Sequence, residues 1–439
     1  MPAQSNLGKR AVVLGASMGG LLAARVVHDH FDEVVLVERD DLSGSGHRKG
    51  VPQGRHTHAL LARGGQTIER LFPGITGELV AEGAVLADAL ADARRFIGGG
   101  YYCRQPCGRK GLLVGRPLLE THVRHRLLAL PNLRLRSEHD ALGLVSDGGR
   151  VTGARIAPVR GTGPGQTISA DLVVDATGRG SKASAWLTAM GYDPPEEEEV
   201  KIGLGYATRY YRRRPEHLGG AKTMMITPTP TTLRAAIVLA QEGERWIMTL
   251  VGYDGSRPPA DDAGFVEFTR GYPTQDLYDL VRSAEPLGDP VPATFPANRR
   301  RRYERLTRFP EGFLVTGDAI CSFNPMYGQG MSVAAAEADA LAECCREGLE
   351  GLALRFFRRS TEVVDIAWAL AAGNDSRLLH PGADRSARTR LLQWYMRRLH
   401  VAARRDPVAA LAFLSVAGLL APPSSVFRPR IAVRVLRGG

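Results

Sequence analysis

A glycine-rich turn near the start of the chain has the composition of a nucleotide-binding site. It reads GASMGG over residues 15–20, and Glu38 follows about 20 residues later. Glycines permit a tight turn and the close approach of a helix, whose free N-terminal N–H groups attract a pyrophosphate. A carboxylate at this distance can accept hydrogen bonds from a ribose. The pattern predicts a dinucleotide site formed by Gly15, Ser17, Met18, Gly19, Gly20 and Glu38.

The same turn also matches G-x-S-x-G, the motif that exposes the nucleophilic serine of a hydrolase, which would be Ser17 here. A hydrolase turn of this kind normally follows several earlier strands, whereas only about nine residues precede the first apolar run of this chain. Glu38 also has no role in that interpretation. We therefore favour the nucleotide site.

The strands and the helix that flank this turn are predicted from the hydrophobic periodicity of the sequence. The apolar run at residues 11–14 predicts a buried parallel strand, a helical pattern extends to about residue 30, and residues 34–37 predict a second strand. Two later apolar runs end in glycine, at Gly178 and at Gly317-Asp318. A carboxylate at a strand end, such as that of Asp318, can accept hydrogen bonds from the hydroxyls of a sugar chain. The glycine-rich turn that follows leads into a long helix, whose positive N-terminal end would stabilise an anionic ring.

A second structural unit is indicated by four alternating segments rich in β-branched and aromatic residues, at 201–211, 221–227, 232–240 and 244–252. Alternation of this kind predicts an antiparallel sheet. The acidic run at residues 194–199 is typical of a linker between units. The sequence therefore predicts a parallel-sheet unit followed by an antiparallel one.

Composition narrows the classes of function. The chain has 439 residues, of which 44% are hydrophobic and 23% charged, so it is globular. A formal charge of +11 first suggests a nucleic-acid partner. The arginines are scattered without an aromatic-interleaved basic stripe, so we expect no nucleic-acid partner, and the densest cluster, Arg299–Arg302, is interpreted as a candidate docking face. Five cysteines in no metal-binding or disulfide pattern, and no signal peptide, lead us to expect a cytoplasmic protein without a metal.

Taken in order, three stretches resemble motifs of flavoprotein monooxygenases of the aromatic-hydroxylase superfamily. They are GASMGG with Glu38-Arg39, DATG at residues 175–178 and GDA at residues 317–319. The finer pattern resembles actinobacterial FAD epoxidases of polyether biosynthesis, of the lasalocid and monensin type. The matching text is RKGVPQ at 48–53, DATGRGS at 175–181, NRR at 298–300 and NPMYGQGMS at 324–332. The similarity covers residues 10 to about 375, and the tail beyond about 386 lies outside it.

The resemblance implies an α/β fold with three parts. A Rossmann-like FAD-binding domain of the p-hydroxybenzoate hydroxylase type would comprise residues 1–199 and 300–350, and it would include the β-meander that strand alternation predicts at residues 133–170. An antiparallel β-sheet substrate domain would comprise residues 200–299, and a C-terminal helical region residues 351–439.

The resemblance also implies the residues of an FAD site. The glycine-rich turn would hold the diphosphate, Glu38 the adenosine ribose, and Asp318 the ribityl hydroxyls. Arg48 would lie near the diphosphate and Arg116 along the ribityl chain. The remaining implied cofactor residues are Arg39, Lys49, Gly317, Pro325, Gly328, Gln329, Gly330 and Met331.

The implied activity is that of an FAD-dependent monooxygenase, which inserts one oxygen atom from O₂ through a flavin C4a-hydroperoxide. Epoxidation or hydroxylation of an apolar natural-product intermediate, such as a polyketide or polyene of an antibiotic pathway, is the leading hypothesis. No carboxylate or histidine has a spacing that marks it as an acid–base group, so we name no catalytic residue. The alternatives are a flavin-dependent halogenase, a prenyl-chain reductase of the same fold and a non-catalytic nucleotide- or nucleic-acid-binding protein.

Two regions carry predictions about the substrate. Five apolar residues are candidates for a substrate wall, with ordinary core packing as the alternative: Tyr206, Met224, Trp246, Met248 and Phe323. Residues 386–420 read as helices that form a packed cap; an apolar lid or a peripheral membrane contact is the alternative.

The source of electrons is predicted from a missing carboxylate. Self-reducing hydroxylases of the superfamily carry an Asp-Gly pair where this chain has Thr177-Gly178. Thr177 can still donate a hydrogen bond to FAD, and Asp175 could restore the carboxylate only if the alignment shifted by two residues. The chain also shows no second glycine-rich unit for NADPH. We therefore expect a separate flavin reductase to transfer electrons from NAD(P)H.

Overall fold

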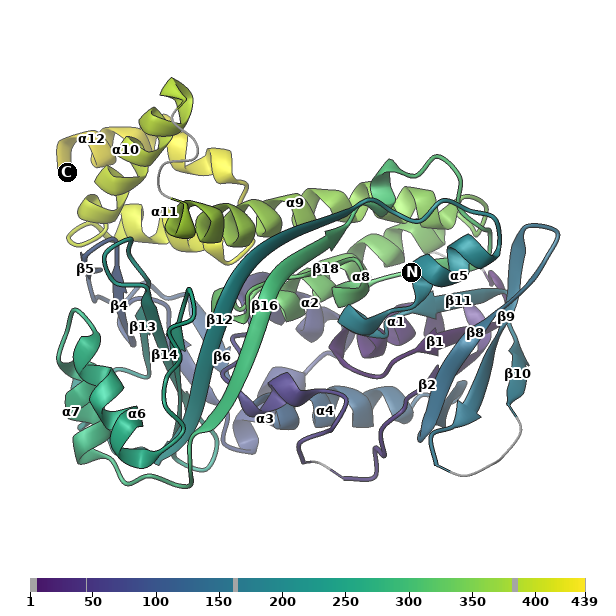
Figure 1. Cartoon of the computed structure of the whole chain (residues 1–439), viewed down its shortest axis with the longest axis horizontal. Helices are drawn as coiled ribbons and strands as arrows, with labels where there is room; N and C mark the ends of the chain where they lie inside the picture. Colours follow the sequence, from purple (N-terminus) through teal and green to yellow (C-terminus); the bar gives the residue numbers. More distant parts are fainter. Residues whose placement is uncertain (1–5, 45, 161–164, 381–385, 439) are drawn as a thin grey trace.

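A five-stranded parallel sheet forms the larger half of the molecule (Figure 1), in a computed structural model that describes residues 6–44, 46–160, 165–380 and 386–438. In sheet order, its strands are β17 (Phe313–Val315), β11 (Leu172–Asp175), β1 (Gly8–Leu14), β2 (Phe31–Val37) and β7 (Leu133–Arg136). Their side chains are mostly buried apolar groups, as expected of parallel strands covered on both faces. The predicted strand–turn–helix–strand unit at the N-terminus is thereby confirmed.

Helices and a small sheet cover the parallel sheet. Helix α1 (Met18–His28) lies against both α4 (Arg116–Leu128) and α8 (Gly330–Arg346), and a three-stranded antiparallel sheet packs against β11. That small sheet consists of β8 (His139–Asp147), β9 (Arg150–Pro158) and β10 (Gln166–Ser169). The β-meander predicted at residues 133–170 is corrected at its first strand, because β7 pairs in parallel with β2 and belongs to the larger sheet. The other elements of this half are α2 (Ala62–Leu71), α3 (Ile75–Ala81), α5 (Ala183–Ala189) and the strand pair β3 (Val85–Asp88) and β6 (Lys110–Leu113).

The second sheet has eight strands and is antiparallel except where β13 pairs with β4. Its order is β18 (Cys321–Ser322), β16 (Val291–Arg301), β12 (Glu197–Arg212), β15 (Arg245–Gly252), β14 (Arg234–Gln241), β13 (Thr223–Ile226), β4 (Ala93–Ile97) and β5 (Gly100–Tyr101). Four of these strands correspond to the four alternating segments of the sequence. The sheet also recruits β4 and β5 from the N-terminal part of the chain.

The two faces of this second sheet meet different partners. One face, which we call the outer face, packs against α6 (Asp262–Phe268) and α7 (Asp276–Ser283). The opposite face, the inner face, contacts Met326 and Tyr327, which precede α8. In Figure 1, α6 and α7 lie at the lower left, on the side of the sheet away from the parallel sheet. The inner face is therefore the one that shares a boundary with the larger half.

The acidic run and the arginine cluster form one structure that the sequence did not predict. Residues 197–199 begin β12, and their cross-strand partners on β16 are residues 299–301. Arg302 binds Glu198 with 2.5 Å between Nη2 and Oε2, while Arg300 and Arg301 are 1% and 6% exposed. The linker interpretation is wrong for residues 197–199, which are strand, while residues 194–196 do connect α5 to β12. The exposed docking face is wrong, because the arginines are largely buried and form ion pairs with acidic residues.

The C-terminal region is helical. Long helix α9 (Leu352–Leu379) runs along the top of the view in Figure 1, and α10 (Ala387–Ala402), α11 (Pro407–Ala417) and α12 (Pro429–Gly438) gather at its end. These last three helices share an apolar cluster, and the hydroxyl of Tyr102 lies 2.6 Å from Nδ1 of His400 on α10. The packed cap is confirmed. Within the described ranges, every helix is too short or too polar to span a bilayer.

Candidate cofactor and substrate site

The glycine-rich turn has the geometry that its glycines predict. Gly15 has a φ of +96°, and a Cβ atom on it would lie 2.5 Å from the backbone oxygen of Ala176. A Cβ atom on Gly20 would lie 1.8 Å from the backbone oxygen of Gly15. Ser17 is the N-cap of α1 but its side chain makes no capping bond, so the positive end of α1 is available to an anion. Met18 is 2% exposed and belongs to the core.

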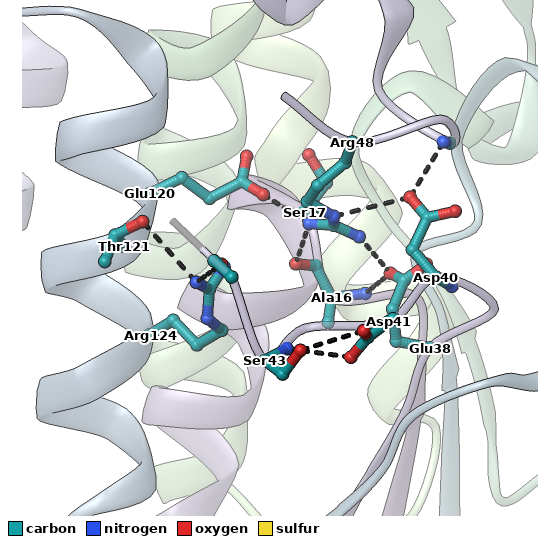
Figure 2. A network of polar contacts seen from close by, with 12 residues as sticks. Ala16, Ser17, Glu38, Asp40, Asp41, Ser43, Arg48, Glu120, Thr121 and Arg124 are labelled. Carbon is teal, nitrogen blue, oxygen red and sulfur yellow. Dashed lines mark hydrogen bonds and ion pairs between the residues drawn. The ribbon is translucent and has the colours of Figure 1, made fainter. Parts of the chain in front are cut away.

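Glu38 and Arg48 occupy the centre of a polar network beside this turn (Figure 2). Glu38 accepts a hydrogen bond from the backbone N–H of Ala16 at 2.7 Å and forms an ion pair with Nη2 of Arg48 at 2.6 Å. Arg48 also donates to the backbone oxygen of Ala16 at 2.9 Å and contacts Glu120. The predicted phosphate ligand Arg48 is therefore held between carboxylates. Glu120 is a member of the network that sequence reasoning missed, although its (i, i+4) spacing from Arg116 was a signal.

Arg116 links the turn to a pair of histidines. It donates to Oγ of Ser17 at 2.8 Å and to Nε2 of His58 at 3.0 Å. His58 therefore carries its proton on Nδ1, which donates to the backbone oxygen of His56 at 2.9 Å. Burial lowers the pKa of His58 to about 3 and that of His56 to about 4, so both imidazoles are neutral near pH 7. Arg39 and Lys49 are exposed and do not join the network.

Asp318 lies where three glycine-rich segments meet. A Cβ on Gly178 would be 3.9 Å from Cβ of Asp318, and one on Gly330 would be 3.7 Å from its Oδ1. This carboxylate accepts no hydrogen bond from any described residue. Desolvation by the surrounding protein raises its pKa, and the nearby charges of Arg116 and Arg179 limit the rise. Because the carboxylate of Asp318 is exposed and has no hydrogen-bond donor among the described residues, it is available to a ligand. Gly317 has a φ of +70°, and a Cβ atom on it would lie 4.0 Å from Cα of Gly19 on α1.

Asp175 cannot substitute for the missing carboxylate of the Asp-Gly pair. It is fully buried, and it accepts hydrogen bonds from Oγ1 of Thr177 at 2.6 Å and from Oγ of Ser181 at 2.6 Å. Both of its oxygens are used to shape the turn after β11. The expectation that Thr177 donates to a ligand is also corrected, because its hydroxyl donates to Asp175.

A buried glutamate on α8 holds the Gly317-Asp318 turn in place through hydrogen bonds. Oε2 of Glu337, on α8, accepts from the backbone N–H of Gly317 at 2.6 Å and from Oγ1 of Thr316 at 2.8 Å. Burial raises the pKa of Glu337 to about 7, and these two hydrogen bonds limit the rise. Sequence reasoning missed this residue, whose only signal was a glutamate within an alanine-rich helix.

This pKa gives a testable pH dependence. Between pH 4.5 and 7, the folded protein keeps the proton of Glu337 while the unfolded chain has lost it, so stability falls as the pH rises. Glu337→Gln keeps the shape but cannot titrate. Comparing urea unfolding of both proteins from pH 4.5 to 8, we expect the variant to gain about 3 kcal/mol relative to wild type. A difference that does not change with pH would contradict the assignment.

The segment 325–331 connects Asp318 to the inner face of the second sheet. Pro325–Tyr327 form a 3-10 turn, and Gly328 ends it with a φ of +64° that is left-handed. Gln329, 3% exposed, is the N-cap of α8, and Gly330 and Met331 begin that helix. The predicted residues of this segment thus lie between Asp318 on one side and the inner face on the other.

Strand alternation decides which predicted substrate residues face this segment. Tyr206 is on the inner face, with its ring 4.6 Å from that of His56. Met224, Trp246 and Met248 are on the outer face, packed against α6 and α7. These three are therefore corrected to core residues, because neighbouring residues of a strand point to opposite faces. Phe323 packs into the core of the parallel-sheet half instead of the inner face.

The inner face offers other apolar side chains in their place. Ile237, Leu239 and Ile247 belong to the same apolar cluster as Tyr206 and Met326. Oγ1 of Thr208 lies 2.8 Å from Nδ1 of His56, so a few polar groups stand at the edge of this apolar surface. The described residues contain no group of three or more side chains suited to a metal.

Comparison with known proteins identifies two relatives that match most of the chain. It is 33% identical over 445 residues to Protein Rv3254 of Mycobacterium tuberculosis, which covers 93% of this chain and 89% of that protein. It is 26% identical over 361 residues to kynurenine 3-monooxygenase of Salinispora arenicola, covering 76% and 72% of the two chains. No family model matches the chain.

Solved structures share the fold at low sequence identity. The flavin-dependent brominase Bmp2 superposes with a TM-score of 0.68 at 13% identity, covering 98% of both chains. Other structures with this fold are flavin-dependent monooxygenases and halogenases. The α/β fold of the p-hydroxybenzoate hydroxylase type is thereby confirmed.

Proposed function

The chain belongs to the family of Protein Rv3254, and on that premise we propose that it is an FAD-dependent monooxygenase acting on an apolar substrate. The observation that carries the proposal is the position of Asp318. Its carboxylate, which accepts no hydrogen bond from the described residues, lies between Gly178 and Gly330 and beside the uncapped N-terminus of α1. The relative named as a kynurenine 3-monooxygenase supports the same class of reaction.

The residues present fit FAD. The uncapped end of α1 would receive the diphosphate and Glu38 the adenosine ribose. Arg116, which contacts Ser17, would lie along the ribityl chain, and Asp318 would accept hydrogen bonds from the ribityl hydroxyls. Arg48 would have to share its contacts with Glu38 and Glu120 in order to reach a phosphate. Reduced FAD, when bound, supplies the activation of O₂.

The protein itself would position the substrate and exclude water from the reaction site. The positive end of α8, with Gly330 at its first turn, would stabilise negative charge that lies close to it. The inner face, with Tyr206 and Ile237, would hold an apolar substrate and exclude water. A neutral His56 beside Tyr206 provides a polar end to that surface. Epoxidation of an alkene fits this surface well, since it needs no dedicated general base.

FAD retention tests the proposal. Asp318→Ala removes hydrogen-bond acceptors for the ribityl chain, so we expect the Kd for FAD to rise about tenfold or more. Titration of the apoprotein with FAD, followed by flavin fluorescence, measures the change. Glu362→Ala, which removes an exposed carboxylate on α9, is the matched control and should leave the Kd unchanged. Protein that never binds FAD, even when made with ample riboflavin, would refute the proposal.

The second candidate is a halogenase, favoured by the fold shared with a flavin-dependent brominase. Halogenases carry a Trp-x-Trp-x-Ile-Pro stretch and an essential lysine; the nearest text here contains only Trp246, which lies on the outer face. The third candidate is a prenyl-chain reductase of the same fold. The mass of the product from a polyene or arene substrate separates them: one added oxygen, one added halogen or two added hydrogens.

A further inference from the structure

A cluster of buried polar side chains lies where the 324–328 loop, the second sheet and α9 meet. We call it the Asp375 cluster; its members are Asn298, Asn324, Tyr253, Tyr327 and Asp375. Asp375, Asn298, Asn324 and Tyr253 are each 0% exposed. A buried carboxylate is expensive unless several donors satisfy it. The donors that satisfy Asp375 therefore show what this carboxylate holds in place.

Its donors come from two segments far apart in the chain. Nδ2 of Asn298, on β16, donates to Oδ2 of Asp375 at 2.8 Å. Nδ2 of Asn324 lies 3.1 Å from each carboxylate oxygen, and the hydroxyl of Tyr327 donates to Oδ1 at 3.0 Å. Burial raises the pKa of Asp375 above its ordinary value, and these hydrogen bonds limit the rise. The carboxylate of α9 therefore holds both ends of the Pro325–Tyr327 turn.

The same turn is fastened at its backbone and at its side chains. The backbone N–H of Asn324 donates to Oδ1 of Asn298 at 2.5 Å, and the side chain of Asn324 accepts from the N–H of Met326 at 3.0 Å. The hydroxyl of Tyr253 donates to Sδ of Met326 at 3.3 Å. Met326 and Tyr327 are the residues that touch the inner face. Their position is thus set by hydrogen bonds that converge on α9.

We propose that Asp375 is a positioning residue that fixes the 324–328 loop between the cofactor site and the inner face. This inference rests on the proposed function and deepens it. A loosened loop would let Met326 and Tyr327 move away from the inner face and admit water to the site. Helix α9 thereby shapes the site from the end of the region that the resemblance to the epoxidases covers.

Three variants test this assignment. Asp375→Asn removes the charge at constant shape, and Tyr327→Phe removes a single donor. A double variant, Asn298→Asp with Asp375→Asn, exchanges carboxylate and amide and so preserves their mutual hydrogen bond. The matched control is Glu362→Gln, on the exposed side of the same helix.

The main measurement is hydrogen exchange of residues 324–328, which needs neither substrate nor FAD. We expect exchange about tenfold faster or more in Asp375→Asn, a smaller increase in Tyr327→Phe and partial recovery in the exchanged pair. Unchanged exchange in the loop, or equal acceleration throughout the protein, would overturn the proposal. If Asp375→Asn does not fold, Tyr327→Phe and the exchanged pair decide by the same criterion.

The second measurement is the visible circular dichroism of bound FAD, together with the quenching of its fluorescence by iodide. We expect Asp375→Asn to retain FAD but to change the circular dichroism of the flavin band and its quenching by iodide, with recovery in the exchanged pair. A variant with unaltered spectrum and quenching would show that the loop does not contact the cofactor region. A protein that binds no FAD would instead refute the proposed function, while hydrogen exchange would still test the link between Asp375 and the loop.

Discussion

Replacing Gly20 by alanine is expected to disrupt the N-terminal turn and to release FAD. The new Cβ atom would lie 1.8 Å from the backbone oxygen of Gly15, so the conflict is with main chain and no side-chain rotation relieves it. Overpacking in a core commonly destabilises by about 1–3 kcal/mol, and a backbone conflict under a helix should reach the upper end or exceed it. Flavin absorbance per protein and the thermal unfolding midpoint measure the effect.

The adjacent residue supplies the control. A Cβ atom on Gly19 would meet its nearest neighbour, Cα of Gly317, at 3.8 Å, which is ordinary van der Waals contact. Both residues are in α1, and both substitutions add one methyl group. We therefore expect Gly19→Ala to keep its unfolding midpoint close to that of wild type. Equal destabilisation by the two substitutions would show that the close approach of α1 to the turn is misjudged.

The second large effect concerns the source of electrons. We expect anaerobic stopped-flow mixing of the oxidised holoenzyme with NADPH to reduce the flavin far more slowly than the turnover of about 10 s⁻¹ that is usual for enzymes. The physical reason is that the position that would carry a carboxylate holds Thr177, whose hydroxyl is committed to Asp175. Asp175 is itself fully buried and satisfied by Thr177 and Ser181.

Dithionite must reduce the same sample, which shows that the flavin is competent. Addition of a flavin reductase with NADPH should restore rapid reduction, because it supplies the missing step. Bleaching by NADPH alone at a catalytically useful rate would contradict the expectation. The docking surface for such a reductase is not the Arg299–Arg302 cluster, whose members are paired with acidic residues at the start of β12 and on neighbouring segments.

Sequence alone was sufficient where the physics is local. The first strand, the tight turn and the helix near Gly15 and Gly20 are dictated by neighbouring residues, because apolar periodicity and glycine conformation act over a few positions. The four alternating segments after residue 200 became strands for the same reason. The order of the glycine-rich motifs along the chain supported the family resemblance from which the fold class was predicted.

Features that depend on how strands pair could be learned only from the three-dimensional fold. The inner or outer position of Tyr206 and Met248 follows from how β12 and β15 pair, and a shift of one residue would exchange the faces. The acidic run and the arginines looked independent in sequence and became cross-strand partners only in register.

The carboxylates show the same division most clearly. Asp175 ends the buried strand β11 and Asp318 closely follows the buried strand β17, so the two look alike in sequence. The fold surrounds Asp175 with donors and leaves Asp318 without one among the described residues. Asp375, 51 residues after Asn324, carried no local signal at all. A hydrogen bond between distant segments is set by the packing of whole elements, which no short stretch of sequence encodes.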